Sequence, residues 1–565
     1  MPLVNRTSTM GLKGRSLRWL VTACAVTGFS LFGYDQGLMS GLLQGDQFTG
    51  EFPVLAEDPL QAASSAHNKH VSVLQGGVTS SYEIGCLFGA VFCLIYGERI
   101  GRKPLVLAGS IIIIIGTIIA TTAFGPHWGL GQFVVGRVVT GIGNGMNTAT
   151  IPVWQSEMSR PEIRGLLVNL EGSVVALGTM IAYWLDFGLS FVPSSVQWRL
   201  PVAVQIVFAL PVFLLLLGLP ESPRWMVAHG RSKEALFIEA QLRGVSEDDP
   251  DVQEAIAIVQ DDVARTGEKL RFRELLRNGR AAYFNRMIIG ASTQFFQQFT
   301  GCNAAIYYST VLFTYMNQTR TMSLIMGGVF ATVYFLATLP SFWLIEHLGR
   351  RRLFLFGAIG QGISFTITFG CLIPARTDTR PELFKGAAVG LYLFITFFGM
   401  SILGLPWVYP PEINPLRTRT AATAISTCTN WLCNFAVVMF TPVFVNVNGE
   451  EGRFGAYLFF AILNFIWVPV IYLFYPETAG RSLEEIDIIF AKAHMDNKLP
   501  FMIAKELPRI PREKLAAEAN KYGIGPESLQ DEEVGPTGKE EFVHSENTER
   551  STTASIVTSV SRSSL

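Results

Sequence analysis

Long apolar runs constrain the fold of this 565-residue chain more than any other feature. Twelve runs of about 20 residues recur, and each is long enough to cross a bilayer as a helix. They are expected near 18–42, 71–96, 104–122, 128–151, 165–190, 200–218, 284–313, 321–345, 353–374, 386–409, 419–445 and 454–475. Only 16% of the residues are charged, against about 25% in a soluble domain. The sequence therefore predicts an all-α membrane protein.

A polar segment divides the runs into two sets of six. We expect a cytoplasmic N-terminal segment (1–17), a first six-helix bundle (18–218), a helical cytoplasmic linker (219–282), a second six-helix bundle (283–475) and a cytoplasmic tail (476–565). From about residue 525 the tail is rich in Glu, Ser and Thr, which predicts disorder. The net charge of −1 argues against a nucleic-acid partner.

Basic residues gather in the loops on one side of the membrane. The segments 97–103 and 346–352 carry three Lys or Arg each and 221–280 carries ten, whereas 43–70 carries one. Basic loops face the cytoplasm in membrane proteins, so both termini are expected inside. Asn317, in an Asn-Gln-Thr sequence, then lies outside as a candidate glycosylation site.

Acidic side chains inside the apolar runs are candidates for function. An ionised carboxylate in hydrocarbon costs about 2.5–3.5 kcal/mol on an insertion scale, so such a group is usually partnered. Asp35 lies in the middle of the first run, and Arg137 in the fourth is its natural partner. The alternative for Asp35 is a helix-end acid that reaches water. Glu171 in the fifth run either titrates or donates to a substrate, or is a neutral acid at a helix contact.

Three motifs of the first half recur in the second half at nearly one offset. The matched positions are Gly101 and Gly349, Glu157 and Glu412, and Glu221 and Glu477, which lie 248, 255 and 256 residues apart. Two parallel six-helix repeats place a substrate site between them near the midplane of the membrane.

The charged residues of these motifs are expected to form one network in each half. The first network comprises Glu98, Arg99, Arg102, Glu157, Arg164 and Glu221, and the second comprises Glu346, Arg350, Glu412, Arg419 and Glu477. Such pairs would latch the cytoplasmic helix ends in an outward-open state and break on inward opening. The alternative is a set of solvated loop charges, which explains the arginines but not the matched glutamates.

The seventh run is rich in amide and phenol side chains. It carries Gln294, Gln297, Gln298, Asn303, Tyr307 and Tyr308. Four amides in one apolar span are costly unless they line a wet cavity, and the alternative is that they hold helices together. Amides and hydroxyls replace the hydrogen bonds that water makes to a neutral polyol, and aromatic faces cover its C–H surface.

Several motifs of the sequence resemble those of a known family, the sugar porters of the major facilitator superfamily, over about residues 18–490. The resemblance is carried by Gly136-Arg137, Pro220-Glu-Ser-Pro-Arg, Gln297-Gln-Phe-Thr-Gly-Cys-Asn303 and Pro476-Glu-Thr-Ala-Gly. The segments 29–39, 151–158, 164–172 and 477–493 resemble, within that family, the fungal glycerol–proton symporters. This implies twelve transmembrane helices in two halves, and proton-driven glycerol import across the plasma membrane. We expect no cofactor besides the proton, and a functional monomer.

The resemblance also implies roles for single residues. The positions matching Gln297, Gln298, Asn303, Trp407, Asn430, Trp431 and Asn434 form the substrate pocket of sugar porters, and Tyr307 is a further candidate. Trp431 is alternatively an interface anchor. Proton-coupled members pair the positions matching Asp35 and Arg137, so protonation of Asp35 would free Arg137 and let two helices repack. Some hexose facilitators keep this aspartate too, so it permits coupling without proving it.

Two departures from the sugar-porter pattern bear on the substrate. Glu171-Gly172 stands where these porters have Asn-Gln, and no Asn occurs between residues 318 and 413. The missing amides argue against a tightly held hexose and suit a smaller triol. The competing functions are a hexose, pentose or other polyol carrier and a transporter-like nutrient sensor. No nucleophile–base set, metal cluster or phosphate loop is evident, so an enzyme is not expected.

Overall fold

The computed structural model describes residues 6–56, 65–125, 128–159, 164–265, 272–316, 318–374, 380–415, 417–447, 450–522 and 524. All regular structure within these ranges is helical. The described helices form twelve spans in two six-helix halves, as the apolar runs predict. Asn317 and the tail from residue 525 lie outside the described residues.

Six long helices make up the N-terminal half. They are α1 (Gly14–Leu42), α3 (Ala66–Ile100), α4 (Arg102–Thr121), α5 (Gly129–Glu157), α6 (Arg164–Leu189) and α7 (Val196–Gly218). Small residues bring α3 and α5 close together, because a Cβ atom at Gly141 or Gly145 would overlap the α3 backbone. Close backbone approach of this kind favours helix packing in a membrane.

Three of the six C-terminal spans are interrupted helices. This half comprises α12 (Tyr283–Phe299), α13 (Cys302–Tyr315), α14 (Arg320–Thr338), α15 (Ser341–Leu348), α16 (Arg350–Leu372), α17 (Pro381–Phe397), a π-helix (Phe398–Ile402), α18 (Leu405–Ile413), α19 (Arg419–Val447) and α20 (Glu450–Phe474). The seventh span breaks at Gly301, where φ is +92°. Irregular backbone at membrane depth is tolerated where it is buried in protein or lines a cavity.

Ten helical segments of the described residues are long and apolar enough to cross a membrane. The two remaining spans are α5 and the broken pair α12–α13. The pieces of the broken span have 17 and 14 residues, so neither is long enough alone. Buried Arg137 and several polar side chains lower the hydropathy of α5.

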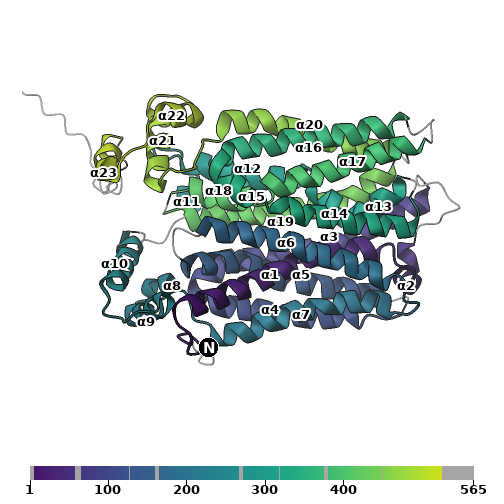
Figure 1. The fold of residues 1–565 in the computed structure, drawn as a ribbon, viewed down its shortest axis with the longest axis horizontal. Coiled ribbons are helices and arrows are strands. Elements are labelled where there is room, and N and C mark those ends of the chain that lie inside the picture. The colour runs from purple at the N-terminus through teal and green to yellow at the C-terminus, as the bar shows by residue number, and fades with distance from the viewer. Residues whose placement is uncertain are drawn as a thin grey trace, which may run out of the picture.

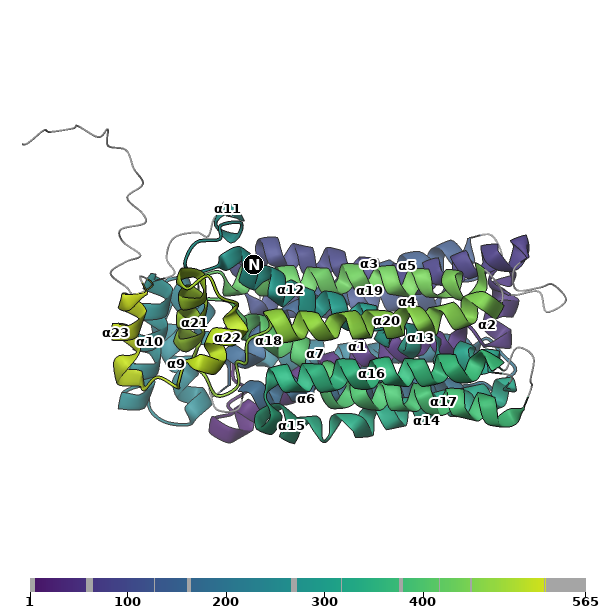
Figure 2. The ribbon, with the colours of Figure 1, turned by 90° about the horizontal axis from the view of Figure 1, so that it is seen from above.

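The two halves lie side by side along the molecule, with the N-terminal half below the C-terminal half (Figure 1). One end of the bundle carries the loops 97–103 and 346–352, and we call it the basic end. Short helices cluster there, as Figure 2 also shows: α8 (Pro223–Ala228), α9 (Ser232–Arg243), α10 (Pro250–Arg265), α11 (Phe272–Leu275), α21 (Leu483–Met495), α22 (Pro500–Glu506) and α23 (Arg512–Lys521). The opposite end carries α2 (Asp46–Glu51) and the 3₁₀-helix Pro53–Leu55.

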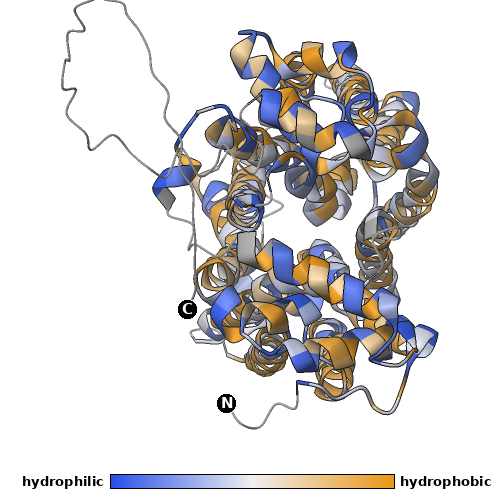
Figure 3. Cartoon of the chain, turned by 90° about the vertical axis from the view of Figure 1, so that its left-hand side faces the viewer, coloured by the Kyte–Doolittle hydropathy of each residue, from blue (hydrophilic) through white to orange (hydrophobic). Residues whose placement is uncertain are grey.

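Exposed apolar side chains cover the outer faces of the long helices. On α4, for example, Ile111, Ile115 and Ile118 are about half exposed and follow one another at helical spacing. Figure 3 views the molecule from the basic end, with helices of the two halves above and below the centre. A belt of exposed apolar side chains is suited to contact with lipid tails.

Candidate functional site

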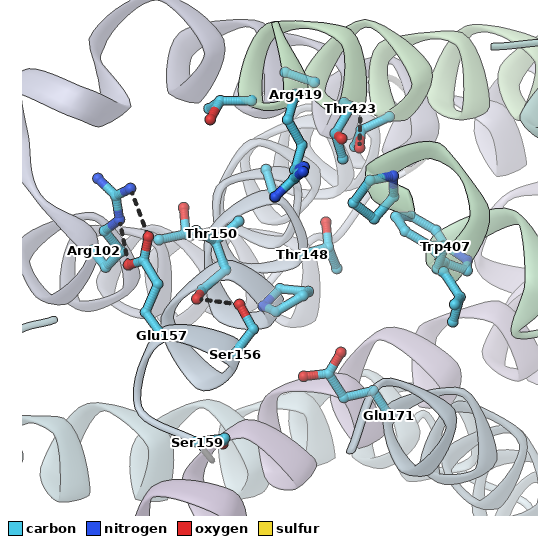
Figure 4. A pocket seen from close by; sticks show the side chains of 18 of the residues that line it. Arg102, Thr148, Thr150, Ser156, Glu157, Ser159, Glu171, Trp407, Arg419 and Thr423 are labelled. Carbon is cyan, nitrogen blue, oxygen red and sulfur yellow. Dashed lines mark hydrogen bonds and ion pairs between the residues drawn. The ribbon is translucent and has the colours of Figure 1, made fainter. Parts of the chain in front are cut away.

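A cavity of about 1160 Å³ lies between the two halves. Its inner part is lined by Gln297, Gln298 and Asn303 of the seventh span, and its outer part by residues of α8, α9 and α10 at the basic end. Figure 4 shows Glu171 of α6, Trp407 of α18 and Arg419 of α19 facing it from different sides. The cavity therefore reaches from the middle of the bundle to the basic end.

Hydrogen bonds between the halves close the opposite end. Ser40 and Thr310 lie 2.9 Å apart between α1 and α13, and Tyr183 lies 2.6 Å from Ser309 between α6 and α13. Further out, Arg320 pairs with Asp46. Access to the cavity is thus open at one end of the bundle and closed at the other.

Asp35 and Arg137 form an ion pair inside the N-terminal half. Arg137 donates to Asp35 between α5 and α1, and each side chain is 1% exposed. The guanidinium carbon lies 4.7 Å from the ring centre of Tyr82, a cation–π contact. The structure thus brings together the two residues that the sequence singles out as partners. Asp35 is buried and does not lie at a helix end that reaches water.

Glu171 lines the cavity as a buried acid. It lies on α6, and no hydrogen bond reaches its carboxyl group from the described residues. The neighbouring Gly172 also lines the cavity, where a Cβ atom would lie 3.5 Å from Leu403. A larger side chain at residue 172 would therefore enter the cavity.

The amides of the seventh span divide between two tasks. Gln294 donates to the carbonyl of Pro406 over 2.8 Å, and Gln297 donates to the carbonyls of Ile402 and Leu403 over 3.1 Å. These carbonyls belong to the π-helix, to α18 and to Leu403 between them, where the tenth span is interrupted. These two amides therefore hold the broken tenth span, as the alternative interpretation from the sequence expects, although Gln297 also lines the cavity.

Three other amides line the cavity and bind one another. Gln298 donates to Asn430 over 2.6 Å, and Asn303 donates to Gln298 over 2.7 Å. Asn303 also donates to Asn434 over 2.6 Å. Gln298, Asn303 and Asn430 line the cavity together with Trp407. Such a group of amides beside an indole matches the chemistry needed to bind a neutral polyol.

Three residues that the sequence analysis expects in the pocket lie behind its wall. Tyr307, Trp431 and Asn434 are fully buried and do not line the cavity. The Trp431 ring packs edge-on against Phe32 at 5.3 Å, as expected for an interface anchor. Tyr308 likewise holds helices together, because it donates to the carbonyl of Val438 over 2.9 Å.

The structure adds three buried polar residues that the sequence interpretation missed. Glu83 on α3 accepts hydrogen bonds from Tyr307 and Asn434. Gln36, beside Asp35, lines the cavity, and Asp186 is a further buried acid on α6. Both acids lie within predicted apolar runs, so the criterion that singled out Asp35 would also have found them.

At the basic end, Arg102 joins three helices of the N-terminal half. It donates to Glu98 over 2.9 Å and to Glu157 over 3.1 Å. Glu221 lies 3.7 Å from the guanidinium of Arg6 and accepts from the N–H groups of Arg102 at 3.0 Å and Lys103 at 3.2 Å. It thereby caps the N-terminus of α4, where a carboxylate is favoured. Burial raises the pKa of Glu221, while hydrogen bonds from the backbone of Ser222 and Lys103 lower it.

The C-terminal half repeats this arrangement. Arg350 donates to Glu412 over 2.8 Å, and Glu477 accepts from the N–H groups of Arg350 at 2.7 Å and Arg351 at 3.1 Å. Glu477 therefore caps α16 as Glu221 caps α4. The sequence repeat corresponds to a repeated helix cap together with an arginine–glutamate pair.

Several members expected in these networks lie elsewhere. Arg99 and Glu346 are exposed and form no ion pair with any described residue. Arg419 donates to the carbonyl of Asn414 at 3.4 Å and lines the cavity instead of pairing with Glu412. The side chain of Arg164 lies outside the described residues. Arg99 and Glu346 fit the alternative of solvated loop charges, because long charged side chains at a loop reach water.

The expectation that these networks latch the helix ends and break on inward opening stays a prediction, and the pairs can be described as they stand here. Arg102–Glu157 and Arg350–Glu412 are intact, although the cavity reaches the basic end. Both pairs join helices within one half rather than across the two halves. They therefore hold the helices of each half together at this end.

The sequence matches known proteins along nearly its whole length. The profile of the family described as "Sugar (and other) transporter" matches residues 20–490. The chain belongs to this sugar transporter family of the major facilitator superfamily. It is therefore a multi-pass membrane transporter of small sugars or polyols, and not an enzyme.

Two fungal members of the sugar transporter family are more than half identical to this chain. "Sugar transporter STL1" of Saccharomyces cerevisiae is 54% identical over 98% of this chain and 95% of its own length. "Major facilitator superfamily transporter mfsA" of Aspergillus fumigatus is 52% identical over 92% of this chain and 94% of its own length. A "Quinate permease" of Neurospora africana is 30% identical over 85% and 91%.

Solved structures support the fold of this sugar transporter. The proton:xylose symporter XylE bound to 6-bromo-6-deoxy-D-glucose superposes with a TM-score of 0.70 at 23% identity, covering 84% of this chain and 99% of XylE. A partially occluded inward open form of XylE from E. coli gives a TM-score of 0.68 at 21% identity. The two halves thus follow the major facilitator fold.

Proposed function

We propose that this sugar transporter imports glycerol across the plasma membrane together with protons. The observation that carries the proposal is the ion pair Asp35–Arg137, buried between α1 and α5. A neutral substrate needs a titrating group on the carrier for uphill transport, and a buried carboxylate whose only strong partner is one arginine can serve as that group. Protonation of Asp35 would release Arg137 and let α1 and α5 repack.

The chemistry of the cavity supports a neutral polyol as the substrate. Gln298, Asn303 and Asn430 offer donors and acceptors, and Trp407 offers an aromatic face. At the cavity wall, Gly172 stands where sugar porters have a sugar-binding amide. The missing side chain leaves fewer hydrogen bonds for a hexose and suits a small triol. The resemblance to the fungal glycerol–proton symporters points to the same substrate.

A pentose or hexose is the second candidate substrate. The cavity of about 1160 Å³ is far larger than a triol requires, so its size does not reject a sugar. The amides that line the cavity would have to bind the sugar ring without an amide side chain at residue 172. Selectivity therefore rests on the hydrogen-bonding groups rather than on the volume.

We assign the basic end to the cytoplasm, because basic loops face inward. Both termini are then cytoplasmic, and the open cavity corresponds to an inward-open state. The monomer encloses the whole cavity and both charged networks, so one chain suffices for alternating access. Outward opening requires the Ser40–Thr310 and Tyr183–Ser309 contacts to separate.

The proposal is tested by external pH in a weakly buffered, de-energised suspension of transporter-null cells expressing the chain. Glycerol is added in one run and glucose in another. We expect transient alkalinisation with glycerol alone, and none in cells without the chain. Alkalinisation with glucose alone would make the protein a sugar symporter. Tracer uptake without any pH change would make it a facilitator and overturn the coupling.

A further inference from the structure

Glu83 lies on α3 in the N-terminal half, yet its carboxyl group is bound by the C-terminal half. Tyr307 of α13 donates to Oε1, and Asn434 of α19 donates to Oε2 over 2.7 Å. The residue is 0% exposed. A carboxylate has only acceptors, so two donors at its two oxygens match the ionised form.

Asn434 begins a chain of amides that ends in the cavity. Asn303 binds both Asn434 and Gln298, and Gln298 binds Asn430, with all three distances between 2.6 and 2.7 Å. Each amide is oriented by the next one. The orientation of the amides that line the cavity therefore depends on the carboxylate of Glu83.

The Asp35–Arg137 ion pair interacts with Glu83 from within the N-terminal half. Arg137 packs over Tyr82, the residue that precedes Glu83, and the charges of Asp35 and Arg137 both act on Glu83. Nε and Nη2 of Arg137 have no described hydrogen-bond partner. When Asp35 takes up a proton, Arg137 loses its counter-ion, and Glu83 is the buried anion that remains within electrostatic range.

Apart from Asp35 and Arg137, the described groups that interact with Glu83 are tyrosine, cysteine and asparagine side chains. Glu83 interacts electrostatically with the following titratable or charged groups: Asp35 from α1, Tyr82 and Cys86 from α3, Arg137 from α5, and Tyr307 and Tyr308 from α13. From α19, the contact is the neutral Asn434. Arg137 is thus the one described cation in this group.

We propose that Glu83 is the positioning residue that joins the proton site to the polyol-binding amides. Protonation of Asp35 turns Arg137 toward Glu83, where it competes with Tyr307 and Asn434 for the carboxylate oxygens. The amide chain is released, so polyol affinity depends on the charge of Asp35. The inference rests on the proposed function, proton-coupled polyol uptake.

The test uses Glu83→Gln in reconstituted full-length protein, with glycerol as the first probe. A glutamine accepts from Asn434 and donates to the Tyr307 oxygen, so both contacts persist without the charge. We expect glycerol exchange to persist, while the KM for glycerol loses its dependence on pH and accumulation is lost. Glu83→Asp keeps the charge, and we expect it to restore part of the pH dependence.

Asp186→Asn is the matched control, because Asp186 is another buried acid of the N-terminal half outside the amide chain. We expect its pH profile to follow the wild type. A wild-type pH profile and full accumulation in Glu83→Gln would overturn the inference. A wild type that takes up no protons with glycerol or glucose would instead overturn the proposed function, so the two failures are distinguishable.

Tyr307→Phe keeps the test decisive if Glu83→Gln does not fold. It removes one hydrogen bond to the carboxylate and leaves the charge in place. We expect the KM for glycerol to change by about tenfold, the size typical of one hydrogen bond to a charged group, with the pH dependence retained. An unchanged KM would contradict a role of the Glu83 contacts in substrate binding.

Discussion

At the scale of single residues, burial decides what each charged or polar group can do. Asp35 and Arg137 are both 1% exposed, so neither finds water as an alternative partner. Arg99 and Glu346, by contrast, are exposed and pair with no described residue. A buried ion pair gives little net stability, but removing one partner leaves an uncompensated charge at large cost.

Asp35→Asn is expected to abolish accumulation and to spare downhill glycerol exchange, because the titrating group is lost. The variant also leaves Arg137 unpaired, which should lower the free energy of unfolding by about 3–5 kcal/mol. The double variant Asp35→Asn/Arg137→Gln should recover part of that stability without recovering accumulation. Tracer accumulation and thermal unfolding in detergent measure both effects. Persistent accumulation would assign the proton to another acid such as Glu171.

Gly172→Gln is expected to shift selectivity from glycerol toward hexose. The glycine lines the cavity, and a Cβ atom there makes only ordinary contact with Leu403 at 3.5 Å. A glutamine can therefore extend into the cavity and supply the missing amide. One added hydrogen bond should change the ratio of the two KM values by about tenfold. Competition of unlabelled glucose with labelled glycerol measures the change, and Gly172→Ala serves as the control; an unchanged ratio would contradict this account of selectivity.

At the scale of elements, the repeated caps show how each half is held together at the basic end. Gly101 precedes α4 with φ of +96°, and Gly349 precedes α16 with φ of +83°. Glu221 and Glu477 then accept hydrogen bonds from the first N–H groups of these helices. A Cβ atom at either glycine would lie 2.6 Å from the capping carboxylate. The recurrence of Gly and Glu in both halves thus has one structural cause.

Gly101→Ala and Gly349→Ala are each expected to lower the free energy of unfolding by about 1–3 kcal/mol, because both positions need a positive φ and have no room for a Cβ atom. Thermal unfolding in detergent measures the loss. Gly370→Ala on α16 is the control, since no atom lies within 4 Å of a Cβ atom there and φ is not positive. Equal stability of all three variants would contradict the cap argument.

At the scale of the whole molecule, contacts between the halves decide which end is open. The described hydrogen bonds that join them concentrate at the opposite end, where α13 meets α1 and α6. Toward the basic end, Asn169 of α6 donates to Ser341 of α15 over 2.9 Å. The ion-pair networks stay within the halves, so the halves can rotate as units about the site.

A disulfide across the closed end should lock the transporter. The hydroxyl oxygens of Ser40 and Thr310 lie 2.9 Å apart, so the pair Ser40→Cys/Thr310→Cys is placed to form the bond. We expect oxidation to stop transport and a reductant to restore it, with each single variant unaffected. All seven native cysteines are free in the structure, so the parent chain treated with the same oxidant is the control. Transport that survives complete cross-linking would show that this contact need not open.

The sequence by itself determined the spans, their division into two halves and the partner of Asp35. These features follow from local composition and from recurrence, because bilayer thickness fixes run length and a buried acid needs a cation. Only the tertiary structure decided which amides face the cavity. Gln294 and Gln298 are both amides of the same run, but Gln294 binds a carbonyl of the interrupted tenth span, whereas Gln298 lines the cavity. Gln297 does both, because it binds carbonyls of the tenth span and also lines the cavity. Only the fold likewise brings Glu83 within reach of Tyr307 and Asn434, since these contacts join residues more than 200 positions apart.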